Sequence, residues 1–146
     1  MVEVRRLARD DEELLASCAA GVFDHPIDEG ATRAFLADSR HHLVVAIAGE
    51  TVVGFASAVH YLHPDKARPE MWINEIGVAP SHRGQGIGKR LLRELLEVAQ
   101  EHGCAEAWTL TERANSAAMQ LYRSLGGVEA QQQQVMFTFV GRDEAH

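Results

Sequence analysis

Six consecutive residues near the middle of the chain have the composition of a phosphate-binding loop. They join an apolar, strand-like stretch (71–79) to an amphipathic, helix-like stretch (87–100), and they read Arg83, Gly84, Gln85, Gly86, Ile87 and Gly88. Glycines lack a Cβ, so the backbone can turn tightly and its N–H groups can approach a ligand closely. A helix that starts there directs further N–H groups and the positive end of its dipole at the same place, which favours a pyrophosphate. The sequence therefore predicts an anion site.

Charge placement around this loop supports an anion site. The chain has a formal net charge of −7, yet residues 76–93 contain no acid and four cations, which are Arg83, Lys89, Arg90 and Arg93. The alternative is an ordinary glycine-rich turn with solvated arginines. The spacing fits neither the G-x-G-x-x-G dinucleotide fingerprint nor the nucleoside-triphosphate loop, because Gly88-Lys89 is followed by Arg90 and not by a hydroxyl residue.

The glycine spacing does match the pattern Q/R-x-x-G-x-G/A, with Arg83, Gly86 and Gly88 at the fixed positions. This pattern resembles the acyl-CoA-binding loop of the GCN5-related N-acetyltransferase superfamily, and the resemblance extends over nearly the whole chain. It implies acetyl-CoA as co-substrate and an α/β (α+β) fold, whose mixed sheet of six to seven strands is splayed between strands 4 and 5 and flanked by about four helices. The cofactor-binding residues that it implies are Ile76, Gly77, Val78, Arg83, Gly84, Gln85, Gly86, Ile87, Gly88, Lys89 and Asn115.

Transfer of an acetyl group from a thioester to an amine needs a base, because an alkylamine with a pKa near the lysine value of about 10.4 is protonated at neutral pH. Glu75 is the candidate base, since it lies within a strand-like run (72–78) where an acid is unusual. We expect it to be partly buried. The alternative is an exposed or salt-bridged glutamate on a solvated sheet face.

The departing thiolate needs a proton donor. Tyr122, in the context L-Y-x-x-L-G, matches the superfamily tyrosine that has this role. The alternative is a core aromatic residue on a helix. The resemblance also implies that the backbone of residues 76–78 binds the pantetheine arm and that an N–H near Val78 is aimed at the thioester carbonyl. Asn115 could contact the cofactor arm, cap its helix, or do both.

Within the superfamily, the closest resemblance is to the aminoglycoside 3-N-acetyltransferases. It covers most of residues 43–137 and rests on Val52-Val53-Gly54, Pro64, Arg68-Pro69-Glu70, Glu75, His82-Arg83 and Val135-Met136. Those enzymes have an aspartate at the position of Glu75. The resemblance implies direct transfer, in a ternary complex, to a cationic small-molecule amine, and an acidic cleft would attract such a polycation. The candidate acceptor-binding residues are Asp24, His25, Asp28, Glu29, His60, Tyr61 and Glu112.

Two other kinds of function stay open. The acceptor could be a polyamine, a protein N-terminus or lysine, or a small metabolite. Alternatively, the chain could be an acyl-CoA-binding module without catalysis, although the presence of both Glu75 and Tyr122 argues against such a module.

Length and composition limit the remaining classes. With 146 residues, 46% of them hydrophobic and 24% charged, the chain is expected to form one domain over 1–146. No apolar run reaches the roughly 20 residues that span a bilayer, and the start lacks a signal-peptide core, so we expect a cytoplasmic protein without a membrane partner. The acidic balance argues against nucleic acid. The resemblance makes a homodimer possible.

The cysteines and histidines predict neither a disulfide nor a metal site. Cys18 and Cys104 are far apart in sequence and are expected to be reduced thiols. The chain has eight histidines, but His41-His42 and His60-x-x-His63 lie beside predicted turns and not at the i, i+4 spacing of a helical zinc site. We therefore expect no bound metal.

The expected elements are placed by periodicity and turn residues. Helices are predicted from Arg9-Asp10-Asp11 to about Val22, from Asp28 or Glu29 to Ala37, over 87–100 with Gly103 as the C-cap, and from Asn115 or Ser116 to Gly126. Strands are predicted over 2–7, 43–48, 52–61, 71–78, 105–111 and 135–140, with 128–130 a possible partner of the last. Residues 62–69 are predicted to be a loop, and Gly49-Glu50 a hairpin turn.

Overall fold

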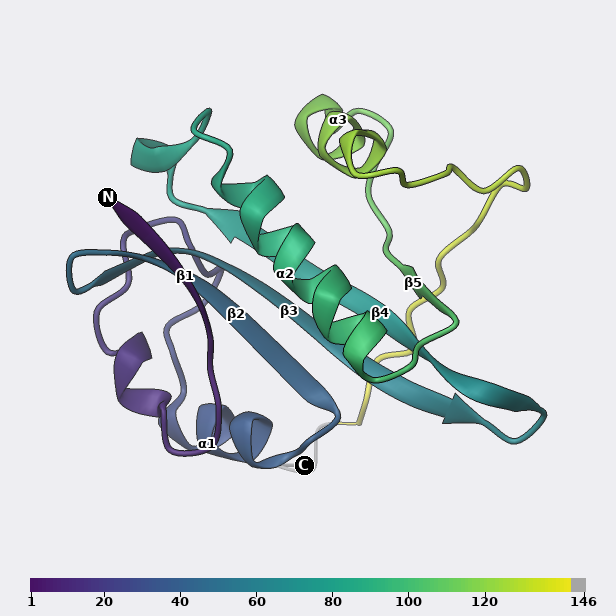
Figure 1. Cartoon of the computed structure of the whole chain (residues 1–146), viewed down its shortest axis with the longest axis horizontal. Helices are drawn as coiled ribbons and strands as arrows, with labels where there is room; N and C mark the ends of the chain where they lie inside the picture. The colour runs from purple at the N-terminus through teal and green to yellow at the C-terminus, as the bar shows by residue number, and fades with distance from the viewer. Residues whose placement is uncertain (143–146) are drawn as a thin grey trace.

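A mixed sheet of five strands, in the order β1-β2-β3-β4-β5, forms the centre of the molecule (Figure 1). The computed structural model describes residues 1–142, so the last four residues of the expected domain lie outside the described part. Neighbouring strands from β1 to β4 are antiparallel, and β5 is parallel to β4. The strands are β1 (Val2–Arg6), β2 (His41–Ala48), β3 (Thr51–His63), β4 (Lys66–Val78) and β5 (Glu106–Trp108).

Three α-helices accompany the sheet within residues 1–142: α1 (Glu29–Ala37), α2 (Ile87–Glu101) and α3 (Ser116–Ser124). Two short 3-10 turns, η1 (Glu12–Leu15) and η2 (Pro80–His82), precede α1 and α2. The expected α/β fold is confirmed, and the described residues form five strands in place of six to seven and three helices in place of about four. None of the described helices has the length and apolar character that crossing a membrane requires.

The two faces of the sheet carry different helices. One face is covered by α2, whose apolar stripe supplies the buried residues Ile87, Leu91, Leu92, Leu95, Val98 and Ala99. Successive strand residues point to opposite faces, and β2 shows both. The ring of His42 packs against His102 at the end of α2, whereas the ring of His41 packs against Phe35 of α1. Helix α1 therefore lies on the face opposite α2.

A bulge in β4 changes which residues share a face. Ser57 of β3 pairs with Glu75, but the next residue, Ala58, pairs with Ile73, so Asn74 is the extra residue. Val59, two positions after Ser57, pairs with Trp72. Glu75 and Trp72 consequently point to the same face, the one that carries α1.

Strands β4 and β5 are paired over a short distance. The parallel ladder joins Glu70–Trp72 to Glu106–Trp108, and the Thr109 hydroxyl then donates to the Ile73 carbonyl at 2.9 Å. Among the described residues, none is paired with β4 on this side from Asn74 to Val78. The structure thus has the expected splay between strands 4 and 5.

Residues 62–69 form the ends of β3 and β4 with a two-residue turn between them, and not the predicted loop. β3 and β4 continue past the predicted boundary to a tight turn, where His63 pairs with Lys66. The two prolines that predicted a loop are accommodated because Pro64 lies in the turn and Pro69 lies where the register shifts. Proline is tolerated at such irregular positions since no ladder N–H is required of it.

The predicted first helix is wrong beyond its first turn. Only η1 is helical, and the chain then runs along the start of β3, where the N–H of Ala19 donates to the carbonyl of Val52 at 2.8 Å and Val52 donates back to Ser17 at 2.8 Å. Cys18 makes an isolated parallel bridge to Val52. These non-local backbone hydrogen bonds replace the helical ladder that the local periodicity predicted.

The predicted final strands are also wrong. Residues 128–130 and 135–140 have no regular structure, and their apolar side chains are exposed, Phe139 at 93% of its surface. β-Branched and aromatic residues fit a strand only when another strand pairs with them. Strand β5 is likewise shorter than the predicted 105–111. In Figure 1 the segment after α3 runs as an irregular chain.

Candidate active site

The glycine loop has the conformation and openness that an anion cradle needs. Gly84 and Gly86 have φ values of 77° and 78°, which side-chain-bearing residues rarely adopt. Apart from the adjoining residues, no described part of the chain lies within 4 Å of the position that a Cβ would occupy on either. Gly86 is the N-cap of α2. The first bond of the helical ladder runs from the Arg90 N–H to the Gly86 carbonyl at 3.1 Å. The N–H groups of residues 87–89 precede that bond and can face a ligand.

The cations near the loop have different surroundings. Arg83 fastens the loop to the end of β4, because its Nε donates to the Val78 carbonyl at 3.1 Å. Arg90 instead donates to the Val2 carbonyl at 3.0 Å and braces β1. Lys89 is half-buried and Arg93 is exposed. The backbone amides, Arg83 and Lys89 are therefore the candidates for binding an anion, whereas the Arg90 side chain is hydrogen-bonded to β1.

Helix α3 lies beside this cradle. A Cβ on Gly88 would lie 3.6 Å from Leu121 Cδ2 and 3.9 Å from Val78 Cγ2, so α3, the first turn of α2 and the end of β4 meet at one point. Tyr122 follows Leu121 and is half-buried. Asn115 caps α3, since its Oδ1 accepts from the Ala118 N–H at 3.1 Å.

Gly77 allows the segment after η1 to pack on β4. A Cβ on Gly77 would lie 2.5 Å from the Val22 carbonyl oxygen and 2.9 Å from Phe55 Cε1, distances that real side chains essentially never show. The ring of Phe23 stacks on Phe55 with 4.0 Å between the ring centroids. The segment that follows η1 is thereby held against the strand that leads into the glycine loop.

This segment lines a pocket with a volume of about 750 Å³. Of the described residues that line it, none is lysine or arginine, and four are acids: Glu12, Glu13, Asp24 and Glu29. The pocket also contains His25. Three predicted acceptor residues, Asp24, His25 and Glu29, are therefore brought together. Asp28 instead caps α1, where its side chain accepts from the Ala31 N–H at 2.8 Å.

Sequence reasoning missed two acids of the pocket, Glu12 and Glu13, and Glu12 has the more unusual surroundings. Its side chain is 18% exposed, with Oε1 3.6 Å from Arg33 Nε. Its Oε2 is buried and has no hydrogen-bond partner among the described residues. A buried carboxylate oxygen without a donor is costly, so a bound ammonium group would stabilise it once the carboxylate turned toward the pocket. The sequence signal was an acid at the predicted start of a helix, which by itself indicates only a favourable charge there.

Glu75 is exposed, so the expected partial burial is not found in this structure. Glu75 pairs with Ser57, which lies two residues from Phe55 along β3 and so points to the same face of the sheet as Phe55. Glu75 therefore points to the face on which Phe23 and the acidic pocket lie. Desolvation of its carboxylate would have to come from bound substrates.

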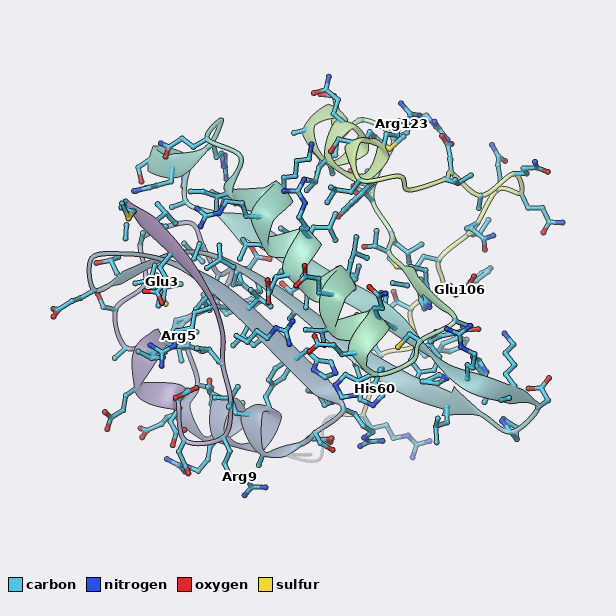
Figure 2. All side chains as sticks on the ribbon, in the orientation of Figure 1. Glu3, Arg5, Arg9, His60, Glu106 and Arg123 are labelled. Carbon is cyan, nitrogen blue, oxygen red and sulfur yellow. The ribbon has the colours of Figure 1, made fainter. Side chains whose placement is uncertain are left out.

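The remaining predicted acceptor residues are divided between the two faces. Tyr61 shares the face of Glu75, accepts a hydrogen bond from Trp108 Nε1 and donates to Glu70 Oε1 at 3.4 Å. Hydrogen bonds from Lys66 and then His63 hold the pKa of Glu70 below its ordinary value. His60 lies on the opposite face, near the C-terminal end of α2 (Figure 2). Glu112 is exposed between β5 and α3.

Comparison with protein families now adds to this geometry. The family model described as acetyltransferase (GNAT) matches residues 3–126. The chain belongs to this family. GNAT acetyltransferases take their acetyl group from acetyl-CoA, and the open glycine cradle beside β4 and α3 fits that co-substrate. The chain is therefore an acetyltransferase, as the glycine pattern predicted.

Relatives in this family act on different amines. The chain is 38% identical to N-alpha-acetyltransferase RimI of Mycobacterium tuberculosis (strain ATCC 25618 / H37Rv), over 86% of the chain and 77% of that protein. It is 36% identical to streptothricin acetyltransferase of Streptomyces lavendulae, over 75% of the chain, and spans 50% of the length of that protein. These relatives support N-acetylation of an amine without fixing which one.

Solved structures confirm the fold. An aminoglycoside acetyltransferase from an uncultured soil metagenomic sample superimposes with a TM-score of 0.81 at 22% identity, over 97% of both chains. A ribosomal-protein-alanine N-acetyltransferase from Brucella melitensis gives 0.72 at 22% identity, over 96% of this chain and all of the other. At such identities the likeness concerns the fold alone.

Proposed function

We propose that this GNAT acetyltransferase acetylates a primary amine of an aminoglycoside, at the 3-amino position, in a ternary complex with acetyl-CoA. The observation that carries the proposal is the buried, unpartnered Oε2 of Glu12 in a pocket lined by four acids. A polycationic sugar would supply ammonium groups to Glu12, Glu13 and Asp24, whereas Glu29 is paired with Arg33 at 3.2 Å. A cleft lined by one sign of charge also accelerates the encounter with a ligand of opposite charge.

The reaction needs few protein groups. The N–H groups around Gly84–Lys89 and the side chain of Arg83 hold the diphosphate of the co-substrate. Glu75 accepts a proton from the ammonium group, directly or through water, and the neutral amine then forms the new C–N bond as the C–S bond breaks. Tyr122 donates its phenolic proton to the departing sulfur, and the second proton that the nitrogen loses on becoming an amide returns, through water, to the Tyr122 phenolate. Backbone N–H groups near Val78 stabilise the carbonyl oxygen as it becomes negative.

Two findings from related proteins support an antibiotic amine as the acceptor. One of the similar solved structures, at 21% identity, holds sisomicin. Streptothricin acetyltransferase is 36% identical over 75% of the chain. The second candidate acceptor is the α-amine of a protein N-terminus, which the 38% identity to RimI favours. We place either reaction in the cytoplasm.

An acceptor panel separates these candidates. Thiol release from acetyl-CoA is measured with sisomicin, a polyamine, and a peptide with a free N-terminus. We expect the highest kcat/KM with sisomicin, and NMR of the product should show the acetyl group on the 3-amino nitrogen. Faster turnover of the peptide would instead establish N-terminal acetylation. Acetyl-CoA binding without release in any reaction would indicate a non-catalytic module.

Glu12→Gln tests the pocket directly. The variant keeps the size of the side chain but removes the charge that would pair with an ammonium group, so KM for sisomicin should rise on the order of tenfold, equivalent to about 1.4 kcal/mol. The affinity for acetyl-CoA should not change. The matched control is Glu50→Gln, which removes an exposed acid from the β2–β3 turn. An equal rise of KM in both variants would mean that overall charge, and not the pocket, attracts the acceptor.

A further inference from the structure

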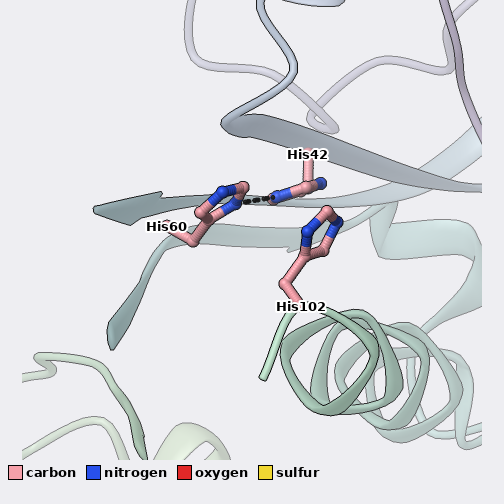
Figure 3. A group of neighbouring side chains, drawn as sticks. All are labelled: His42, His60 and His102. Atoms are coloured by element: carbon pink, nitrogen blue, oxygen red, sulfur yellow. Dashed lines mark hydrogen bonds between the residues drawn. The ribbon is translucent and has the colours of Figure 1, made fainter. Parts of the chain in front are cut away.

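Three histidines from three separate elements meet at the C-terminal end of α2 (Figure 3). His42 comes from β2, His60 from β3, and His102 directly follows the helix. One ring nitrogen of each lies within 4.8 Å of the others, and His42 Nε2 is 2.8 Å from His60 Nδ1. The three rings also pack closely, with centroids 4.5 to 5.0 Å apart. Nitrogen atoms from all three elements therefore converge on one small volume.

The convergent atoms have the chemistry of ligands for a divalent transition metal. Neutral imidazole suits zinc, copper and nickel, and zinc binds three histidines together with a water in known sites. Zn–N distances of about 2.0–2.1 Å in a tetrahedral site place the nitrogens roughly 3.4 Å apart. The 2.8 Å distance between the His42 and His60 nitrogens is shorter than this spacing, and the 4.8 Å within which all three nitrogens lie is longer. Small side-chain rotations would bring the three nitrogens to the spacing of a zinc site.

The surroundings of the cluster permit a cation. His42 and His60 are half-buried and His102 is exposed, so an ion and a water have access from one side. The charged groups nearby are paired with each other: Arg6 with Glu101 at 2.6 Å, and Arg40 with Asp38 at 2.9 Å. Neither arginine is left as an uncompensated positive charge beside the ion.

We propose that His42, His60 and His102 form a zinc-binding site that fastens the end of α2 to β2 and β3. The site would be separate from the acetyl-transfer machinery for two reasons. The histidines lie on the face of the sheet opposite Glu75, and the 15 residues of α2, about 22 Å long, separate them from the glycine loop. The ion would thus be structural, and its fourth position would hold water.

The test is titration of tag-free, EDTA-treated protein with ZnCl2 by calorimetry, together with thermal unfolding. We expect one Zn²⁺ per chain and a rise in Tm with zinc, because an ion that binds only the folded state stabilises it. His102→Asn removes the exposed ligand, and an amide is a poor ligand for zinc. The zinc affinity of this variant should fall by more than roughly 10–100-fold, which is the loss that follows removal of an outer-shell partner of a metal ligand.

A matched control comes from the adjacent residue of β2. His41→Asn makes the same substitution on the opposite face, against Phe35, and should leave zinc affinity unchanged. Co²⁺ should give tetrahedral ligand-field absorption bands in wild type and His41→Asn but not in His102→Asn. The proposal is overturned if wild type takes up no stoichiometric zinc, if His102→Asn binds as tightly as wild type, or if His41→Asn loses affinity equally. These readouts do not depend on acetyl transfer.

Discussion

The N-terminal end of α2 follows an open glycine loop, whereas its C-terminal end is followed by His102, whose ring packs against the rings of His42 and His60. The first end presents backbone N–H groups, and the space where Cβ atoms would stand on Gly84 and Gly86 is free, within 4 Å, of all described residues except their immediate neighbours. The second presents side chains from β2, β3 and the residue after the helix, in mutual contact. One helix therefore carries a candidate site made by local backbone conformation and a candidate site made by tertiary packing.

The difference shows what kind of information specifies each site. The cradle depends on consecutive residues, because glycine alone adopts positive φ at little cost and the helix dipole follows from the helix itself. The histidine cluster depends on which strands are neighbours and on their register, since His42 and His60 meet only because β2 and β3 pair. Variants at the two ends should consequently separate catalysis from metal binding and stability.

Tyr122→Phe should have the largest effect and should act only at the N-terminal end. Loss of the phenolic proton donor is expected to lower kcat roughly 10²–10⁴-fold, with little change in acetyl-CoA affinity. Steady-state thiol release and calorimetry measure the two quantities. His102→Asn, at the other end, should leave turnover unchanged. If Tyr122→Phe kept the wild-type kcat, Tyr122 would not be the acid that protonates the departing thiolate.

Glu75→Gln should have the next largest effect, a loss in kcat/KM of about 10²-fold. We expect this loss to lie at the lower end of the range for removal of a general base. Glu75 is exposed, so a water molecule can take over part of its role. The pH–rate profile should lose its alkaline-rising limb. Glu75→Asp keeps a carboxylate and should retain the limb. An unaltered profile in Glu75→Gln would show that another group accepts the proton.

Gly86→Val and Gly103→Val compare the two ends of α2 with the same substitution. Both glycines have positive φ, 78° and 72°, and open space around the missing Cβ, so each variant should lose about 1–2 kcal/mol of stability from backbone strain. Only Gly86→Val should weaken acetyl-CoA binding, on the order of tenfold, or about 1.4 kcal/mol. Denaturant unfolding and calorimetry measure these. Equal loss of acetyl-CoA affinity in both variants would contradict the assignment of the cradle.

Glu101→Gln should have the smallest effect and should concern stability alone. Hydrogen bonding to Arg6 holds the pKa of Glu101 below 4.5 in the folded chain. The pair therefore stabilises the fold at pH values above about 4.5, and this contribution is lost as the pH falls through the lowered value. Both side chains are about half exposed, so the change in Tm near pH 7 should be slight and should diminish with salt. If Glu101→Gln changed the Tm equally at pH 3 and pH 7, the dependence of stability on the ionisation of Glu101 would be contradicted.

Particular segments show how far the sequence predicts the fold. Helix α1, helix α2 and the β2–β3 hairpin occur where periodicity and turn residues placed them, because each is stabilised by contacts close in sequence. Residues 16–22 were predicted as helix, but Ser17 and Ala19 are hydrogen-bonded to Val52 across the fold. Residues 135–140 have strand composition but no partner in the described structure. Local propensity cannot report whether a distant strand is available.

The candidate site divides in the same way. Sequence reasoning named the cradle and Tyr122, and it grouped Asp24, His25 and Glu29, which do line one pocket. It did not find Glu12, whose importance lies in a buried oxygen without a partner. It also could not place His60 on the face opposite Glu75, because the bulge at Asn74 sets which residues of β4 share a face with β3.

By itself, the sequence determined the glycine loop, the main helices, the acidic balance and the membership of an acetyltransferase family. These features follow from consecutive residues, whose backbone preferences and charges act over short distances. Tertiary structure alone decided that Glu12 lines a pocket, that Glu75 is exposed on the pocket side of the sheet, and that His42, His60 and His102 converge. Each of these depends on strand pairing and register between residues far apart in the chain, where a shift of one residue would reverse the face to which a side chain points.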